Sequence, residues 1–137
     1  MFDDLLYRLS RSTKARQMVT PVLRGYLRYF PGTAGKEALW NRVMDPYLAW
    51  ESHGFIAPTV FGQRLAGDTK DMIQQYIYYF GLWEPFLTGW ISEQLRPGDG
   101  FIDVGANIGY YSLLAATLVG GNGSVVAIEA SAGILSR

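Results

Sequence analysis

Two carboxylates flank a glycine-rich turn near the end of the chain. Asp103 lies in the segment FIDVGANIGYYSLLAA (101–116), before the turn, and Glu129 lies in GSVVAIEA (123–130), after it. Gly105 and Gly109 have no Cβ atom, so a ligand can come close to the main chain there. One carboxylate suits an ammonium group, and the other can accept hydrogen bonds from both hydroxyls of a ribose. The pattern predicts a ligand with an amino-acid group at one end and a nucleoside at the other.

The spacing of this turn differs from the usual dinucleotide fingerprint. That fingerprint reads G-x-G-x-x-G and holds a pyrophosphate at a helix N-terminus. Here Asn107 stands at the second glycine position and Asp103 adds a negative charge, and both oppose a pyrophosphate. Glu129 lies 20 residues after Gly109, the separation expected of a ribose-binding acid. S-adenosylmethionine satisfies both carboxylates, and a nicotinamide dinucleotide, as in an NAD-binding oxidoreductase fragment, remains an alternative.

A β-α-β unit is predicted to position the turn. Residues 100–104 are a short apolar run between turn residues and predict a buried parallel strand. Residues 110–119 predict a helix, residues 125–130 predict the next buried strand, and Ser131 can cap a further helix. Such a unit binds its ligand at the carboxyl ends of its strands. The predicted fold class is α/β, with an incomplete Rossmann-like unit after a mainly helical N-terminal segment.

Helices and a hairpin are predicted before this unit. In the helical segment 1–54, Thr20 and Pro21 predict the start of a helix that ends at FPG (30–32). Residues 54–68 are rich in β-branched and aromatic residues and are broken by Pro58 and Gly62, which predicts an edge strand or an irregular hairpin.

Two further helices complete the entry segment, residues 55–99. The first is predicted to begin at Asp68 or Thr69 and to end at Gly81, and the second has Pro85 in its first turn. The apolar stripes predicted to face the core are Ile73, Tyr76, Ile77 and Phe80 in the first helix and Phe86, Trp90, Ile91 and Leu95 in the second.

The composition removes several classes of function. The 137 residues are 49% hydrophobic, which is enough for one modest core. Twelve basic and twelve acidic residues cancel, so the balance gives no reason to expect a nucleic-acid partner. The chain has no cysteine, which excludes disulfide frameworks, zinc ribbons and thiol nucleophiles, and no metal site is predicted.

The N-terminal part carries an excess of positive charge. Residues 1–50 contain eight basic and four acidic residues, which leaves +4. Arg24 and Arg28 lie on the polar side of the predicted helix, where a solvated face is expected. The alternative is that the basic N-terminal helices contact an anionic membrane surface or a partner, in a non-enzymatic interaction module. There is no signal-peptide pattern and no apolar window of about 18 residues, which predicts a cytoplasmic protein without a transmembrane segment.

The two motif segments resemble motifs I and II of class I S-adenosylmethionine-dependent methyltransferases. They are especially similar to the FkbM family, whose first motif reads D-V-G-A-N-x-G, and FGLWEPFLTGWISEQLRPGD (80–99) is similar to the entry segment of that family. The resemblance covers about residues 55–131. It implies O-methylation of a hydroxyl on a small molecule, such as a sugar, a polyketide or a related metabolite. It also implies that Asp103 and the turn Gly105–Gly109, including Ala106, hold the methionine part and that Glu129 holds the ribose.

Other candidate residues lie around this set. Glu84 is the acid of the entry segment that can reach the cofactor side, although first-turn acids commonly serve the helix dipole instead. Tyr111, next to Tyr110, can line the cofactor pocket. His53 and Asp71 are expected to be structural, and no catalytic base is predicted.

The predicted cofactor domain, residues 100–137, is short for a methyltransferase. Such a domain needs more strands than the two predicted here. The expectation is an N-terminal fragment that is inactive alone, with the adenine pocket, the substrate pocket and any general base beyond it.

Overall fold

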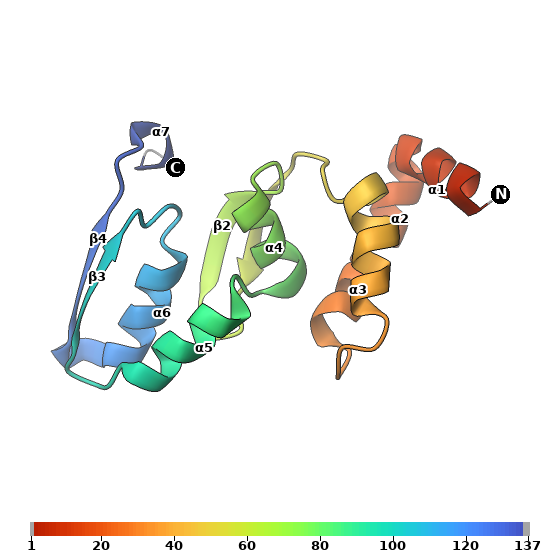
Figure 1. Cartoon of the computed structure of the whole chain (residues 1–137). Coiled ribbons are helices and arrows are strands. Elements are labelled where there is room, and N and C mark those ends of the chain that lie inside the picture. The colour runs from red at the N-terminus through yellow and green to blue at the C-terminus, as the bar shows by residue number, and fades with distance from the viewer. Residues whose placement is uncertain (1, 136–137) are drawn as a thin grey trace. The chain divides into compact units, whose positions relative to one another are not determined.

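The structure, a computed structural model, describes residues 2–135 and is a mixed α/β structure (Figure 1). Within these residues the strands form two sheets of two strands each, β1–β2 and β3–β4. The elements in chain order are α1 (Phe2–Arg11), α2 (Thr13–Tyr29), α3 (Lys36–Leu39), the π-helix η1 (Trp40–Leu48), β1 (Gly54–Pro58), β2 (Arg64–Asp68), α4 (Met72–Phe80), α5 (Pro85–Gln94), β3 (Gly100–Val104), α6 (Tyr110–Val119), the 3₁₀ turn η2 (Gly120–Asn122), β4 (Ser124–Ile128) and α7 (Ala132–Leu135).

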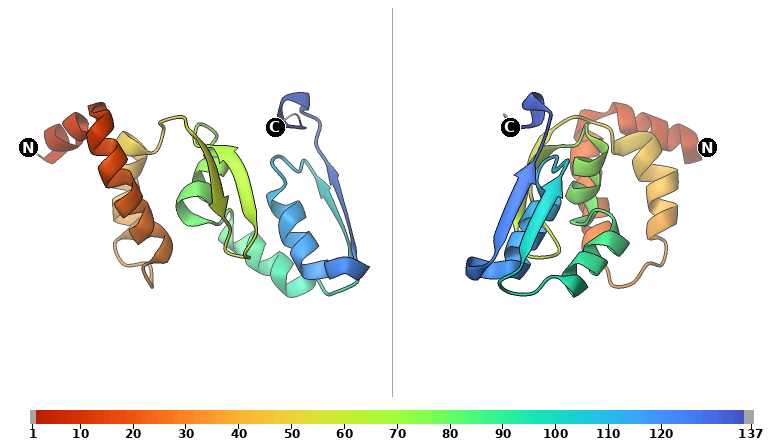
Figure 2. Two further views of the ribbon diagram at one scale, coloured as in Figure 1. Left: turned by 180° about the vertical axis from the view of Figure 1, so that it is seen from behind. Right: turned by 60° about the vertical axis from the view of Figure 1, so that its left-hand side comes forward.

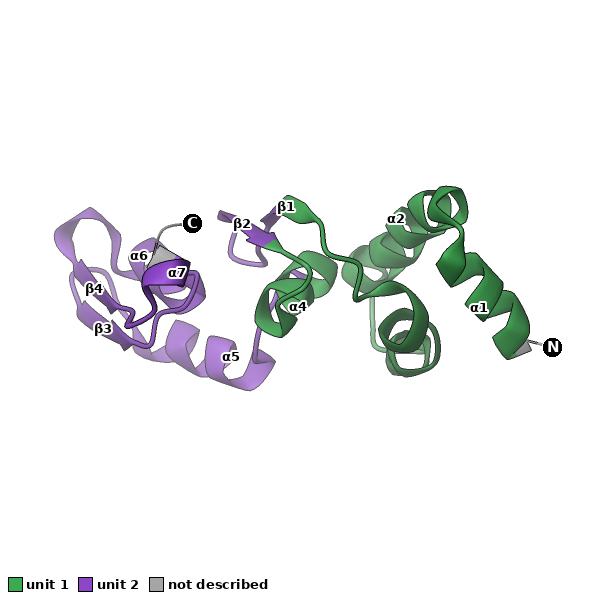
Figure 3. Ribbon diagram, turned by 90° about the horizontal axis from the view of Figure 1, so that it is seen from above, with its two compact units in different colours: residues 1–55, 68–80 green, residues 56–67, 81–137 purple. Residues whose placement is uncertain are grey.

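Packing divides the chain into two compact units (Figure 3). Unit 1 contains residues 1–55 and 68–80, and unit 2 contains residues 56–67 and 81–137. The units are interleaved in sequence because the hairpin β1–β2 runs from one into the other and α4 belongs with the N-terminal helices. The segments 1–54, 55–99 and 100–137 follow composition and motifs, so they divide the chain differently.

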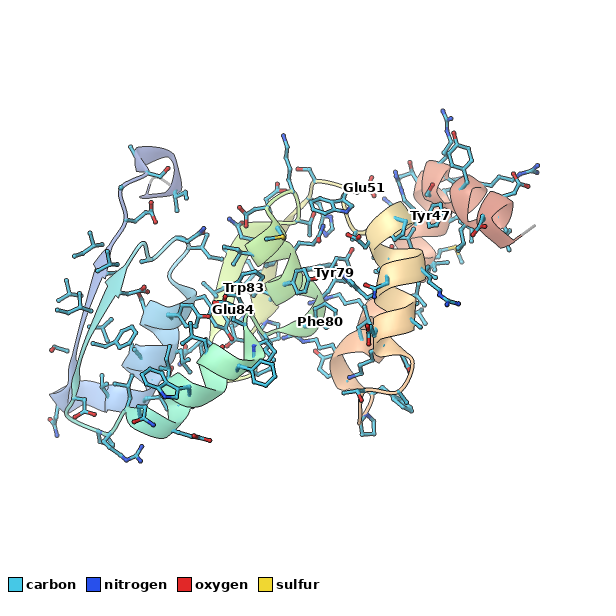
Figure 4. The ribbon with its side chains drawn as sticks, viewed as in Figure 1. Tyr47, Glu51, Tyr79, Phe80, Trp83 and Glu84 are labelled. Atoms are coloured by element: carbon cyan, nitrogen blue, oxygen red, sulfur yellow. The ribbon has the colours of Figure 1, made fainter. Side chains whose placement is uncertain are left out.

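The core of unit 1 forms where α2, η1 and α4 meet. The ring of Trp40, at the start of η1, lies 5.4 Å from the ring of Tyr79 and 5.0 Å from that of Phe80, measured between centroids. Figure 4 labels these two α4 residues. The buried residues of this cluster are Leu27, Trp40, Met44, Leu48, Ala49 and Tyr79.

Helix α2 begins eight residues earlier than predicted. It starts at Thr13, where the Ser12 hydroxyl accepts a hydrogen bond from the Ala15 amide at 3.4 Å, and Pro21 lies inside it. The prediction of a start at Thr20–Pro21 was wrong, because the helix continues through Pro21 although an internal proline removes a hydrogen bond and strains the helix. The turns before Pro21 also pack against α1, which keeps them helical.

Arg24 and Arg28 do not form the predicted solvated face. The Arg24 Nε donates to the Tyr78 carbonyl at 2.8 Å, and its guanidinium lies 4.0 Å from the centre of the Tyr78 ring. Arg28 Nη1 donates to the carbonyls of Ile77 and Tyr78 at 3.4 and 3.3 Å. The last carbonyls of a helix lack helical partners and attract cations. Both arginines therefore fasten α2 to the end of α4.

The start of α4 also differs from the prediction. The Asp71 carboxylate accepts a hydrogen bond from the Gln74 amide at 3.0 Å, so Asp71 caps the helix instead of Asp68 or Thr69. Asp71 is thus the structural residue that the sequence predicted. The end of the helix at Gly81, which has φ of 73°, is confirmed.

The buried side of α4 is broader than the predicted stripe. Ile77 is fully buried, whereas Ile73, Tyr76 and Phe80 are only half-buried. Gln75 is buried beside Ile77, and its amide donates to the carbonyls of Ala49 and Thr69 at 2.8 and 3.3 Å. These bonds satisfy backbone carbonyls inside unit 1 and explain a buried glutamine in a predicted apolar helix.

In unit 2, the sheet β3–β4 carries a single helical layer. The two strands are parallel as predicted, with Asp103 opposite Ala127 and Val104 opposite Ile128. Helix α6 lies along one face (Figures 1 and 2) and buries Leu114. The side chains on the other face, Ile102, Val104, Val126 and Ile128, are 50–76% exposed.

The prediction that both strands are buried was therefore wrong. Successive side chains point to opposite faces of a sheet, so one helical layer covers only half of them. Strand β4 is also shorter than predicted, because it ends at Ile128.

Helix α5 turns a different side inward than predicted. Pro85 occupies its first turn as expected, and Ile91 is buried. Phe86 and Trp90, however, are 94% and 59% exposed. Thr88 is buried instead, and its hydroxyl donates to the Trp83 carbonyl at 2.6 Å. Compared with the prediction, α5 is therefore turned about its axis, so that Thr88 faces the core and both aromatic rings face outward.

Candidate functional site

The turn after β3 has a left-handed backbone at three positions. Gly105 and Gly109 both have φ of 81°, which disfavours any residue with a Cβ, and Asn107 has φ of 49°. Asparagine tolerates this conformation, and the Asn107 side-chain oxygen accepts a hydrogen bond from the Ile108 amide at 2.7 Å. No atom lies within 4 Å of the point where a Cβ on Gly105 would stand. The turn is thus open beside Gly105, as the sequence predicted.

The amides of this turn are occupied by protein acceptors. Because Gly105 and Ala106 both donate to the Ile128 carbonyl, at 2.8 and 3.1 Å, the turn is fastened to the end of β4. The remaining amides, those of Asn107, Ile108 and Gly109, donate to Glu129, to the Asn107 side chain and to the Ala106 carbonyl. The turn therefore lacks the unoccupied amides with which glycine-rich loops cradle a phosphate.

The structure brings Glu129 to the turn. One carboxylate oxygen accepts the Asn107 amide at 2.8 Å, and the other accepts the Ser131 amide at 2.7 Å. These bonds, with Ser131 contributing most and Asn107 next, lower the pKa of Glu129 below its ordinary value. Glu129 is half-buried, and the lowered pKa keeps it ionised at neutral pH. Each carboxylate oxygen accepts more than one hydrogen bond, so a ligand hydroxyl can still bind here.

Asp103 lies on β3, two residues before Gly105, and faces α6. It lies on the face of β3 that α6 covers, is buried, and accepts a hydrogen bond from the Ser112 hydroxyl at 2.6 Å. Sequence reasoning missed Ser112, although its place three residues after Gly109, in the first turn of the helix, was a usable signal. Asp103 accepts its hydrogen bond from α6, and Glu129 accepts one from the turn. These hydrogen bonds do not join the two carboxylates to each other.

Glu84 and Tyr111 form a second pair at the start of α6. The Tyr111 hydroxyl donates to the Glu84 carboxylate at 2.5 Å. Glu84, labelled in Figure 4, directly precedes α5 but its side chain makes no capping hydrogen bond to that helix. Its φ of 42° is left-handed, and such backbone strain is concentrated at functional sites. The Glu84 carboxylate therefore binds Tyr111 and does not cap the first turn of α5, which was the alternative role.

Tyr110 packs inside unit 2 instead. It is buried, its hydroxyl lies 3.2 Å from the Thr88 hydroxyl, and its ring is 5.3 Å from the ring of Phe61. Tyr110 is therefore a core residue of unit 2, whereas Tyr111 hydrogen-bonds to Glu84.

A change at Glu84 should alter the titration of Tyr111. Burial, followed by the hydrogen bond to Glu84, raises the pKa of Tyr111 above its ordinary value of 10.0. The neutral phenol therefore stabilises the folded chain below pH 10, and this contribution is lost as the pH rises through the raised pKa. We expect Glu84→Gln to lower the pKa of Tyr111, because a neutral amide repels the phenolate less than a carboxylate does.

Alkaline titration of phenolate absorbance measures this shift. Subtracting the titration of Tyr111→Phe in each background isolates Tyr111 from the other tyrosines. Tyr79, whose pKa burial also raises, is the internal control and should not move. An unchanged Tyr111 titration in Glu84→Gln would contradict the pairing.

His53, which lies outside the turn, is surrounded by residues of unit 1. His53 Nδ1 lies 3.1 Å from the Glu51 carbonyl and 3.1 Å from the Thr69 hydroxyl, and its ring meets Tyr78 edge-on. These contacts all lie within unit 1 and agree with the structural role expected of His53. Across residues 2–135, no three acidic or histidine side chains are grouped closely enough to hold a metal ion.

Comparisons with known proteins add no relative. Family models, curated proteins and solved structures all give no significant match to this chain. In the part of the chain that the structure describes, no helix has both the length and the apolar character needed to cross a bilayer. The functional assignment therefore depends on the residues around the turn.

Proposed function

We propose that unit 2 binds S-adenosylmethionine and is the cofactor-binding part of an FkbM-like O-methyltransferase. The acceptor would be a hydroxyl on a sugar, a polyketide or a related small molecule. One observation carries the proposal: an ionised glutamate at the end of β4 is fastened to a left-handed, open glycine turn at the end of β3. The carboxyl ends of adjacent parallel strands are where α/β sheets bind their ligands.

The residues present fit the two ends of this cofactor. Glu129 offers charged oxygens to the ribose hydroxyls, and such charge-assisted hydrogen bonds are stronger than neutral ones. The space beside Gly105 admits a ligand close to the main chain, near Ala106 and Asn107. Asp103 supplies negative charge on the side expected to receive the methionine ammonium group. Glu84 and Tyr111 would line the same side from α5 and α6.

The role proposed for these residues is to bind and orient the methyl donor. When bound, S-adenosylmethionine supplies a methyl group on a sulfonium, which an oxygen nucleophile displaces in line. The turn and its carboxylates hold the donor in place, and correct placement of reactants is a large part of such catalysis. A base would remove the proton of an unactivated hydroxyl. None of the residues described here is assigned that task.

The open face of β3–β4 supports binding without turnover by this chain. Parallel sheets are normally covered on both faces, and here Ile102 and Val104 face outward on one side. None of the described residues is assigned as the base or to an acceptor pocket, so we expect this part of the chain to bind the cofactor without transferring its methyl group.

The occupied amides of the turn favour this proposal over a nicotinamide dinucleotide. A pyrophosphate needs unoccupied N–H groups, and it would meet the charge of Glu129 at Asn107. Calorimetric titration of the chain with S-adenosylhomocysteine and, separately, with NADH distinguishes the two ligands. We expect heat of binding from S-adenosylhomocysteine alone. Heat from NADH alone would overturn the proposal.

A further inference from the structure

The outer face of α2 is unusually apolar. Met18, Val22 and Tyr29 are 75%, 70% and 72% exposed and follow one another at intervals of four and seven residues, so they share one side of the helix. We call these three residues the α2 ridge. The opposite side carries Leu23 and Leu27, which pack in the core of unit 1. A surface helix normally turns polar residues outward, so the ridge is suited to a non-aqueous neighbour.

The same helix is strongly basic. Its 17 residues, TKARQMVTPVLRGYLRY, include four arginines or lysines and no acidic residue. Arg16 pairs with Glu51 at 2.8 Å, whereas Arg24 hydrogen-bonds to a neutral carbonyl. Lys14 lies exposed one turn before Met18, and Arg11 is exposed just before the helix. The ridge is therefore bordered by positive charge.

We propose that the α2 ridge lies on an anionic lipid surface. Interfacial helices combine an apolar face at the level of the acyl chains with lysines and arginines near the headgroups. Met18 and Val22 supply the apolar part, and Tyr29 is an amphipathic ring of the kind that favours the membrane interface. The helix lies on the surface and does not cross it.

Charge favours a lipid surface over a second copy of the chain. Two copies joined through their ridges would bring two basic helices together, and like charges across an interface are repulsive. An anionic surface instead attracts Lys14, at the start of the ridge, and Arg11, just before the helix, which are both exposed. This choice is independent of the function proposed for unit 2.

A single fluorescent label tests where the ridge goes. The chain has no cysteine, so Met18→Cys carries one polarity-sensitive dye on the ridge. With vesicles of phosphatidylcholine and phosphatidylglycerol, we expect the emission to strengthen and shift to the blue, and added salt should reverse the change. The matched control, Phe86→Cys, labels a side chain that is 94% exposed on α5 and should not respond.

Vesicle co-sedimentation of unlabelled chains gives the second test. The double change Met18→Glu with Val22→Glu should abolish sedimentation with anionic vesicles, and Lys14→Ala should weaken it about fivefold. Ile56→Glu with Val60→Glu makes the same change of charge at exposed apolar residues of unit 2 and should bind like the unchanged chain.

Three results would overturn the proposal. Equal binding to pure phosphatidylcholine vesicles would remove the role of charge. A dye response that grows with protein concentration in the absence of vesicles would show a second copy on the ridge. Equal losses in both double variants would show a general effect of added negative charge.

Discussion

Replacing Glu129 with alanine should weaken binding of S-adenosylhomocysteine by about tenfold to a hundredfold, because hydrogen bonds to a charged group are among the stronger ones. The structure holds this carboxylate at the turn through the Asn107 and Ser131 amides. The substitution removes the acceptor for the ribose hydroxyls together with its charge. Isothermal calorimetry of the two chains measures the change in the dissociation constant.

Two control variants make this result specific. Glu129→Gln keeps one acceptor oxygen and loses the charge, so its affinity should lie between those of the unchanged chain and Glu129→Ala. Glu93→Ala removes an exposed acid of α5 away from the turn and should bind normally. Thermal unfolding of each variant shows whether the turn has simply collapsed. Unchanged affinity in a folded Glu129→Ala chain would contradict the ribose assignment.

The largest loss of stability in unit 2 is expected from Gly123→Ala. A Cβ at this position would lie 2.4 Å from the Val119 Cβ and 2.7 Å from the Asp99 carbonyl oxygen. Neither atom is at the free end of a flexible side chain, so backbone between α6 and β4 must move. Overpacking of this kind costs about 1–3 kcal/mol, and we expect the upper end of that range.

Gly121→Ala is the matched control. It lies two residues away, and no atom stands within 4 Å of its added Cβ. Urea denaturation followed by circular dichroism gives the free energy of unfolding for both variants. Gly121→Ala should change it by a few tenths of a kcal/mol. Similar losses in the two variants would show that the connection tolerates movement at Gly123.

The strand, turn and helix at the candidate site could be predicted from the sequence. Glycines separate the elements there, and the predicted strand 100–104 and helix 110–119 have the observed bounds. The approach of Glu129 to the turn follows from the same arrangement, because neighbouring parallel strands end at one edge. The Glu84–Tyr111 contact joins residues 27 apart, so each residue could be proposed but their hydrogen bond could not.

Where the predictions were wrong, partners distant in sequence decided the outcome. Arg24 and Arg28 were predicted to lie on a solvated face. The local sequence could not show their hydrogen-bond acceptors, because these are carbonyls of α4 about fifty residues later. Phe86 and Trp90 were predicted to face the core because they share a helical stripe with Ile91. Ile91 is buried as predicted, but Thr88 is buried in place of the two aromatic residues. Periodicity locates a helix well, but which side it buries depends on neighbours that a local pattern does not contain.

The assignment of α4 to unit 1 has a consequence for how the chain folds as it is synthesised. Trp40 packs on Tyr79 and Phe80, so the first 55 residues lack aromatic partners that appear only at the end of α4. Domains tend to fold as units as they emerge from the ribosome. The core of unit 1 is therefore expected to form only after residue 80 has left the exit tunnel. Expression of residues 1–54 alone would yield N-terminal helices without α4, which completes their core.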